Sequence, residues 1–263
     1  MLNMRHLPSF IFCVGAICAM SSDASAQLME YSTGHGDIGI EYIEGATPVD
    51  AELELHWHIE GGTVDGTMYG DEEFEAEDLV AITSLKAQRP AGDVWDAIGN
   101  NGGDTFWFLP QSNSAADNAD VPFLGLASEE MILDPANAGD PPINPWVSDL
   151  TWTFELNSGP GEFSIWQSDG VSDPDFFVSS AEGITTFTNG VGGHDHFNYG
   201  FTALGDYDIQ ITVSATHDNG TASTADDFVV SDSRSFAFSA VPEPSSFALL
   251  ASLGLVGMMR RRR

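Results

Sequence analysis

Apolar and polar residues alternate along six short segments of this chain, and this pattern constrains the fold more than any other feature. Such alternation is typical of strands with one buried face, because successive side chains of a strand point to opposite sides. Turn-forming residues flank the segments, which are 51–60, 105–110, 150–156, 163–168, 205–215 and 234–240. Short strands at close spacing predict an all-β chain, a β-sandwich of immunoglobulin-like or jelly-roll-like type.

Two parts of the chain are expected to depart from the strand pattern. Residues 71–89 contain few turn formers and space their apolar residues as a short helix would, so we expect a short helical or irregular insertion there. The polar stretches 110–123 and 134–145 are interpreted as loops. The sandwich domain is expected to span residues 27–240.

Both ends of the chain have the features of targeting segments. Residues 1–26 combine a basic residue, a short apolar run and the small-residue step Ala24-Ser25-Ala26. This order is typical of a signal peptide, which signal peptidase removes. Residues 241–263 combine a Pro-Glu-Pro step, an apolar run and four terminal arginines. We expect a short transmembrane segment here, with the arginines on the cytoplasmic side.

The C-terminal segment closely resembles the PEP-CTERM sorting signal, whose pattern is this tripeptide, a hydrophobic segment and a basic tail. The resemblance implies processing by an exosortase in the inner membrane of a Gram-negative-type bacterium. It also implies an exported protein that the C-terminal segment anchors transiently in the inner membrane. The expected destination is the cell surface or the extracellular space.

The predicted mature chain is strongly acidic and contains no cysteine. Cys13 and Cys18 both lie in the predicted signal peptide, which excludes a disulfide and a thiolate metal site from the mature domain. Between the two targeting segments the basic residues are Lys86, Arg89 and Arg234. With a net charge of -32 for the whole chain, no basic surface is available for phosphates, so nucleic acid is excluded as a partner.

Two pairs of histidines share an unusual spacing, with one residue between the two members. His56 and His58 lie in a predicted strand, where they share a face at a Cα separation of about 7 Å. His194 and His196 repeat the spacing. Two imidazoles on one face can converge on one ion, and a second such strand alongside could bring four ligands together. The alternative for a single pair is an exposed position beside a core-facing Trp57.

A fifth histidine, His35, extends the pattern to three clusters, whereas His217 looks like an ordinary loop residue. This clustering predicts a transition-metal site, because imidazole is a preferred ligand of zinc. The predicted ligands are His35, His56, His58, His194 and His196, with Asp37 and Asp195 as additional candidates. Either aspartate could instead hydrogen-bond a ligating imidazole. Five histidines exceed the usual four ligands of zinc. The sequence is therefore compatible with one bound ion or with two.

The interior of the chain resembles the surface-anchored repeat domain, also called the choice-of-anchor M domain. The segments that carry the resemblance are TFWFLPQ, VPFLGLASEEM, LTWTFELNSGPGEFSIWQSD and GGHDHFNYGFTALGDYDIQITVSA. The chain departs from the family pattern where Leu204-Gly205 replaces a Pro-Gly turn. Together with the sorting signal, it looks most like the zinc-repressor-regulated PEP-CTERM family.

This second resemblance implies Zn²⁺ as the bound ion and a role in zinc capture, storage or hand-over under zinc limitation. It also implies, as partners, a zinc ABC importer or the extracellular polysaccharide matrix. We accordingly expect a binding protein rather than an enzyme.

Two other classes of protein stay open. A zinc-dependent hydrolase needs an open coordination position and a general base, but the sequence has no His-Glu-x-x-His signature. A structural or adhesive matrix module could bind Ca²⁺ through Asp169, Asp173 and Asp175, because calcium prefers oxygen ligands. An ordinary turn also explains that segment. The tryptophans lie mostly in predicted strands, which favours core positions over carbohydrate binding.

Overall fold

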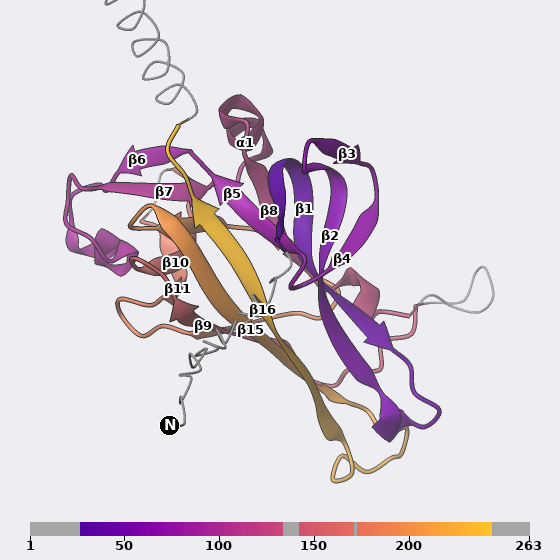
Figure 1. The fold of residues 1–263 in the computed structure, drawn as a ribbon. Coiled ribbons are helices and arrows are strands. Elements are labelled where there is room, and N and C mark those ends of the chain that lie inside the picture. The colour runs from indigo at the N-terminus through magenta and orange to yellow at the C-terminus, as the bar shows by residue number, and fades with distance from the viewer. Residues whose placement is uncertain (1–26, 134–141, 171–172, 244–263) are drawn as a thin grey trace, which may run out of the picture.

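The computed structural model describes residues 27–133, 142–170 and 173–243, which form one sheet of 11 strands and another of 5 (Figure 1). The strands are β1 (Met29–Ile43), β2 (Glu52–Val64), β3 (Thr67–Tyr69), β4 (Glu72–Glu75), β5 (Leu79–Thr83), β6 (Lys86–Gln88), β7 (Thr105–Leu109), β8 (Pro122–Ala127), β9 (Leu150–Ser158), β10 (Phe163–Gln167), β11 (Asp175–Ser179), β12 (Thr186–Asn189), β13 (His194–His196), β14 (Asn198–Phe201), β15 (Gly205–His217) and β16 (Phe228–Ala240). The helical elements are α1 (Asn113–Ala119) and the 3-10 helices η1 (Pro48–Asp50), η2 (Asp93–Ile98) and η3 (Glu129–Met131). The predicted all-β, sandwich-like class is confirmed.

The larger sheet follows the order β12-β9-β15-β16-β5-β1-β2-β3. Three short strands join it off this path, because β4 pairs with β2, β8 pairs with β1, and β13 pairs with β8. β1 pairs along one edge with β2 and along the other with β5 and then β8. The strands β13, β8, β1, β2 and β4 are therefore successive neighbours, and they carry the candidate site.

The smaller sheet follows the order β11-β10-β14-β7-β6 and packs on the larger one through an aromatic core. The rings of Phe163 and Phe201 lie 6.1 and 5.6 Å from the ring of Phe238 in the larger sheet. Burying a side chain of this size contributes roughly 1.5–3 kcal/mol to stability. The predicted core position of the tryptophans is confirmed for Trp57, Trp146, Trp152 and Trp166, while Trp95 and Trp107 are half-buried.

Trp57 anchors β2 in this core. Its side chain is fully buried, its Nε1 donates to the carbonyl oxygen of Ala76 at 3.1 Å, and its ring meets Phe236 edge-on. Because Trp57 points inward, His56 and His58 on either side of it point to the opposite face of the sheet.

Residues 71–89 contain no helix, so the expected helical or irregular insertion is wrong. They form β4, β5 and β6. In β5, Leu79, Ala81 and Thr83 are buried while Val80 and Ile82 are half-buried, which is the period of a strand. The apparent helical spacing arose because apolar residues of separate strands were counted as one series.

The polar stretch 110–123 is only partly a loop. It contains α1, which ends where Asp120 adopts a left-handed conformation with φ of 56°, and it includes the start of β8 at Pro122. A single buried residue, Ala116, faces the protein from this helix, so the sequence shows little amphipathic pattern there.

His217 is a core residue and not the loop residue expected from the sequence. It ends β15, is 4% exposed, and its Nε2 lies 2.8 Å from the hydroxyl oxygen of Tyr42. Its ring also meets Trp146 edge-on. These contacts give His217 a packing role away from the other histidines.

The predicted signal peptide lies outside the described residues, as do residues 134–141 of one predicted loop and residues 244–263 of the predicted sorting segment. Within the described ranges, no helix has the length and apolar character needed to span a bilayer.

Candidate metal centre

Three neighbouring strands bring the first group of candidate ligands together. β8 lies between β1, to which it is parallel, and β13, to which it is antiparallel. Gly125 of β8 is the register partner of both Asp37 on β1 and His196 on β13. His35 and His194 each lie two residues away on the same strands. All four polar side chains therefore project from one face of the sheet.

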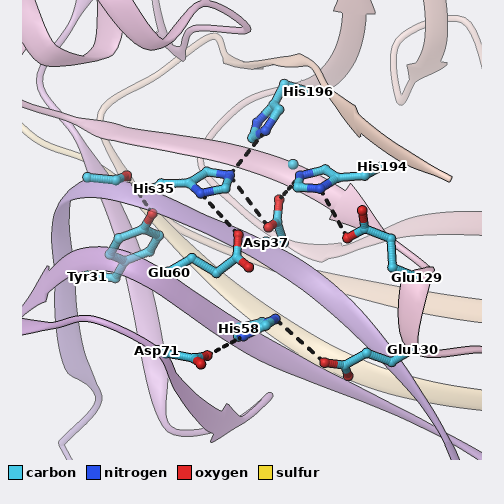
Figure 2. Close-up of polar contacts among 12 residues, drawn as sticks. Tyr31, His35, Asp37, His58, Glu60, Asp71, Glu129, Glu130, His194 and His196 are labelled. Carbon is cyan, nitrogen blue, oxygen red and sulfur yellow. Dashed lines mark hydrogen bonds and ion pairs between the residues drawn. The ribbon is translucent and has the colours of Figure 1, made fainter. Parts of the chain in front are cut away.

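The side chains of His35, Asp37, His194 and His196 converge (Figure 2). One ligand atom of each lies within 4.8 Å of those of the other three. Nε2 of His35 lies 3.2 Å from Nε2 of His196, and Nε2 of His194 donates to Oδ1 of Asp37 at 3.0 Å. The second carboxylate oxygen of Asp37 is buried without a hydrogen-bond partner. Such an atom is costly to bury, and a bound cation would satisfy it.

Two glutamates contact the outer nitrogens of this cluster. Oε2 of Glu60 lies 3.1 Å from Nδ1 of His35, and Oε2 of Glu129 lies 3.2 Å from Nδ1 of His194. A carboxylate beside one ring nitrogen holds the proton there and leaves the other nitrogen available to a metal ion. Figure 2 shows both contacts at the edge of the cluster, away from its centre.

Two residues of β8, Phe123 and Gly125, contact the cluster. The ring of Phe123 stacks on that of His196, with centroids 3.6 Å apart. At Gly125, a Cβ atom would overlap Oδ1 of Asp37 and would lie 3.0 Å from Cε1 of His196. The absence of a side chain at this position therefore makes room for the carboxylate.

The two histidines of β13 have opposite pKa shifts. The hydrogen bond to Asp37 raises the pKa of His194 to about 9, although burial acts against it. Burial lowers the pKa of His196 to about 4, and the neighbouring His194 and His35 lower it further against the attraction of Asp37. Without a metal ion, His196 is therefore neutral and His194 is protonated at neutral pH.

Any metal affinity of this cluster is expected to rise with pH up to about pH 9. A metal ion that ligates His194 must displace the proton of that histidine, whose pKa is about 9, so each pH unit below that value costs about tenfold in apparent affinity. Competition with a chelator of known affinity at pH 7, 8 and 9 measures this slope. An affinity that stays constant over this range would show that His194 does not ligate as a neutral imidazole.

His56 and His58 share a face, as predicted, but the structure groups them apart from the other three histidines. His56 lies with Glu73 and Glu130, whose ligand atoms are within 4.8 Å of its own. His58 contacts Asp71 through Nε2 at 2.9 Å and Glu130 through Nδ1 at 3.9 Å. Burial lowers the pKa of His58, but the hydrogen bond to Asp71 and the nearby carboxylates outweigh it, so the pKa is raised. Four of the five predicted ligands thus lie in one of two clusters, and His58 lies in neither.

The two additional candidate aspartates have different positions. Asp37 is 1% exposed and belongs to the first cluster. Asp195 is exposed, and strand alternation turns it away from the face that His194 and His196 share. Among the described residues, Asp195 belongs to neither cluster.

The aspartates considered for calcium lie elsewhere. Asp169, Asp173 and Asp175 line one surface hollow together with Gln111. Within the ranges that the structure describes, they do not form a group of three carboxylates close enough to share an ion.

Several carboxylates and one glycine of these clusters were not found from the sequence. Glu60 follows His58 at strand spacing on β2, so alternation could have placed it on the same face. Gly125 and Glu73 gave no local signal, because their roles depend on which strands pair. Glu129 and Glu130 belong to a short 3-10 turn, where spacing does not indicate orientation.

Comparison with known families identifies residues 240–263 as a PEP-CTERM protein-sorting motif. This motif marks an exported protein that is anchored transiently through its C-terminus and processed by exosortase. Fold and motif together therefore define an exported β-sandwich protein of the cell surface. Comparisons with curated proteins and with solved structures found no match to this chain.

Proposed function

We propose that this protein binds zinc outside the cytoplasm through His35, Asp37, His194 and His196. The observation that carries the proposal is the convergence of three imidazoles and one buried carboxylate from two strands far apart in the sequence. Zinc usually takes four ligands in protein sites and prefers nitrogen donors of this kind. Calcium prefers oxygen ligands, so a donor set dominated by imidazole disfavours it.

The donor set favours capture or storage over catalysis. Catalytic zinc sites typically have three protein ligands and keep one position for water, whereas structural sites use four protein ligands. Here three histidines and Asp37 supply four, and the glutamates that could act as a base contact the outer nitrogens of His35 and His194. These contacts favour glutamates that orient the zinc-binding imidazoles over glutamates that act as a general base.

The solvent access of the site and the negative charge of the protein favour an ion that exchanges with the surrounding solution. The side chains of His35 and His194 are 28% and 22% exposed, so the cluster is reachable from solvent. A net charge of -32 raises the concentration of cations near the surface. The resemblance to the zinc-repressor-regulated PEP-CTERM family also supports zinc capture under scarcity and hand-over to a zinc importer.

The double variant His194→Ala, His196→Ala is expected to lose the zinc that this cluster binds in the exported wild-type protein. Because both ligands come from β13, their removal leaves His35 and Asp37 alone, and the affinity should fall by more than about 100-fold. Elemental analysis after dialysis against chelator-buffered zinc measures the retained metal. Asp195→Ala, between the two histidines but on the other face, is the control.

Other results would contradict the zinc proposal or favour another class of protein. If wild-type protein retains no stoichiometric transition metal, or if the double variant retains as much, the zinc proposal is wrong. Hydrolysis that depends on added zinc would favour the hydrolase. Calcium-dependent melting without zinc binding would favour the matrix module.

A further inference from the structure

We propose that this protein has a second divalent-cation site, formed by His56, Glu73 and Glu130. One ligand atom of each residue lies within 4.8 Å of those of the other two. None of these residues belongs to the first cluster, so the second site stands on its own contacts and does not require the first.

An unpartnered, buried imidazole nitrogen points to a ligand at this position. His56 is 5% exposed, and its Nε2 has no hydrogen-bond partner. Its Nδ1 lies 3.3 Å from the carbonyl oxygen of Glu54, which can only accept, so Nδ1 carries the proton. The lone pair of Nε2 is therefore free, and the nearest carboxylate oxygen, Oε2 of Glu130, lies 3.8 Å away. A cation would fill this gap and satisfy both atoms.

The backbone of two neighbouring strands holds the position open. On β1, Gly39 is the register partner of His56, and a Cβ there would lie 2.6 Å from Nε2 of His56. On β4, Glu73 is the register partner of His58, so its side chain lies on the same face as both histidines. Glycine on one side and a carboxylate on the other thus frame the imidazole.

The chemistry of these donors predicts a weaker site than the first. One imidazole with two carboxylates suits zinc and other divalent ions of the first transition row. Glu73 and Glu130 are exposed side chains, and ordering both on binding should make the affinity about tenfold lower, or more, than that of the first site.

An acidic hollow of about 130 Å³ lies beside the second site and is lined by its Glu130. Glu60 and Glu129, which contact His35 and His194 of the first cluster, also line this hollow. The consecutive residues Glu129 and Glu130 of η3 contact His194 of the first cluster and His56 of the second.

The test is equilibrium dialysis of the exported protein against Zn²⁺ alone, at chelator-buffered concentrations, with the bound zinc counted by elemental analysis. Wild-type protein should bind two equivalents, the second at least about tenfold more weakly. Glu73→Gln, Glu130→Gln should lose the weaker equivalent and keep the tighter one. Both positions are exposed, so folding is preserved. Glu72→Gln, an exposed neighbour on the other face of β4, is the matched control and should keep both equivalents.

The outcomes separate the two sites. If the Glu73→Gln, Glu130→Gln protein binds as much zinc as wild type, or if wild type binds only one equivalent that this variant retains, the second site is refuted. If zinc is lost in this variant but retained in His194→Ala, His196→Ala, the second site stands and the first is wrong. Protein that binds no zinc refutes both.

Discussion

Replacing Gly125 with alanine is expected to weaken zinc binding at the first cluster strongly while the sandwich still folds. The new Cβ would overlap Oδ1 of Asp37 and crowd Cε1 of His196, so two of the four ligands are displaced at once. Zinc affinity should fall by more than about 100-fold, since changes to groups that only support metal ligands already cost 10–100-fold. The overpacking should lower the free energy of unfolding by about 1–3 kcal/mol.

Chelator competition measures the affinity of the Gly125→Ala protein, and circular dichroism with thermal melting checks its fold. Gly70→Ala is the matched control, because Gly70 is exposed, has an ordinary φ, and a Cβ there meets no atom within 4 Å. If Gly125→Ala binds zinc as tightly as Gly70→Ala, the ion does not lie over β8.

Replacing Asp37 with asparagine is expected to weaken zinc binding and to lower the pKa of His194. Asparagine preserves the size of the side chain but removes the negative charge, so the affinity should fall by about 100-fold or more. Without zinc, the pKa of His194 should drop from about 9 toward its ordinary value of about 6.5, because the hydrogen bond to Asp37 is the main cause of the shift.

Chelator competition and an NMR titration of the His194 ring measure these two effects. Asp195→Asn carries the same chemical change next to His194, on the other face of β13, and should leave both quantities unchanged. Equal losses of affinity in the two variants would point to the general negative charge of the protein rather than to a ligand at Asp37.

Alternation predicted the fold class because many strands of this protein have one buried face. The predicted segments at 51–60, 105–110, 150–156, 163–168, 205–215 and 234–240 correspond to β2, β7, β9, β10, β15 and β16. β1 was not predicted as a strand, although it carries His35 and Asp37. Gly34, Gly36 and Gly39 interrupt its alternating pattern. At each of these positions a Cβ atom would collide with backbone or side-chain atoms of β2, so glycine is needed there.

The histidines of the candidate site could be selected from the sequence, but their grouping could not. His35 and His196 are 161 residues apart and meet only because β8 lies between β1 and β13. Nothing in the local spacing shows that β4, rather than β13, is the neighbour of His56 and His58. The supporting glutamates were equally hidden, because an acidic chain offers 40 carboxylate residues and most are ordinary surface positions.

The most direct test of zinc coordination is X-ray absorption at the zinc edge, on exported protein loaded with one equivalent of zinc. We predict four nitrogen or oxygen neighbours at about 2.0–2.1 Å, with the outer-shell scattering of three imidazole rings. When His194 and His196 are replaced by alanine, the scattering of two of these three rings should be lost. A shell of six oxygens without imidazole scattering would contradict a site built from His35, Asp37, His194 and His196.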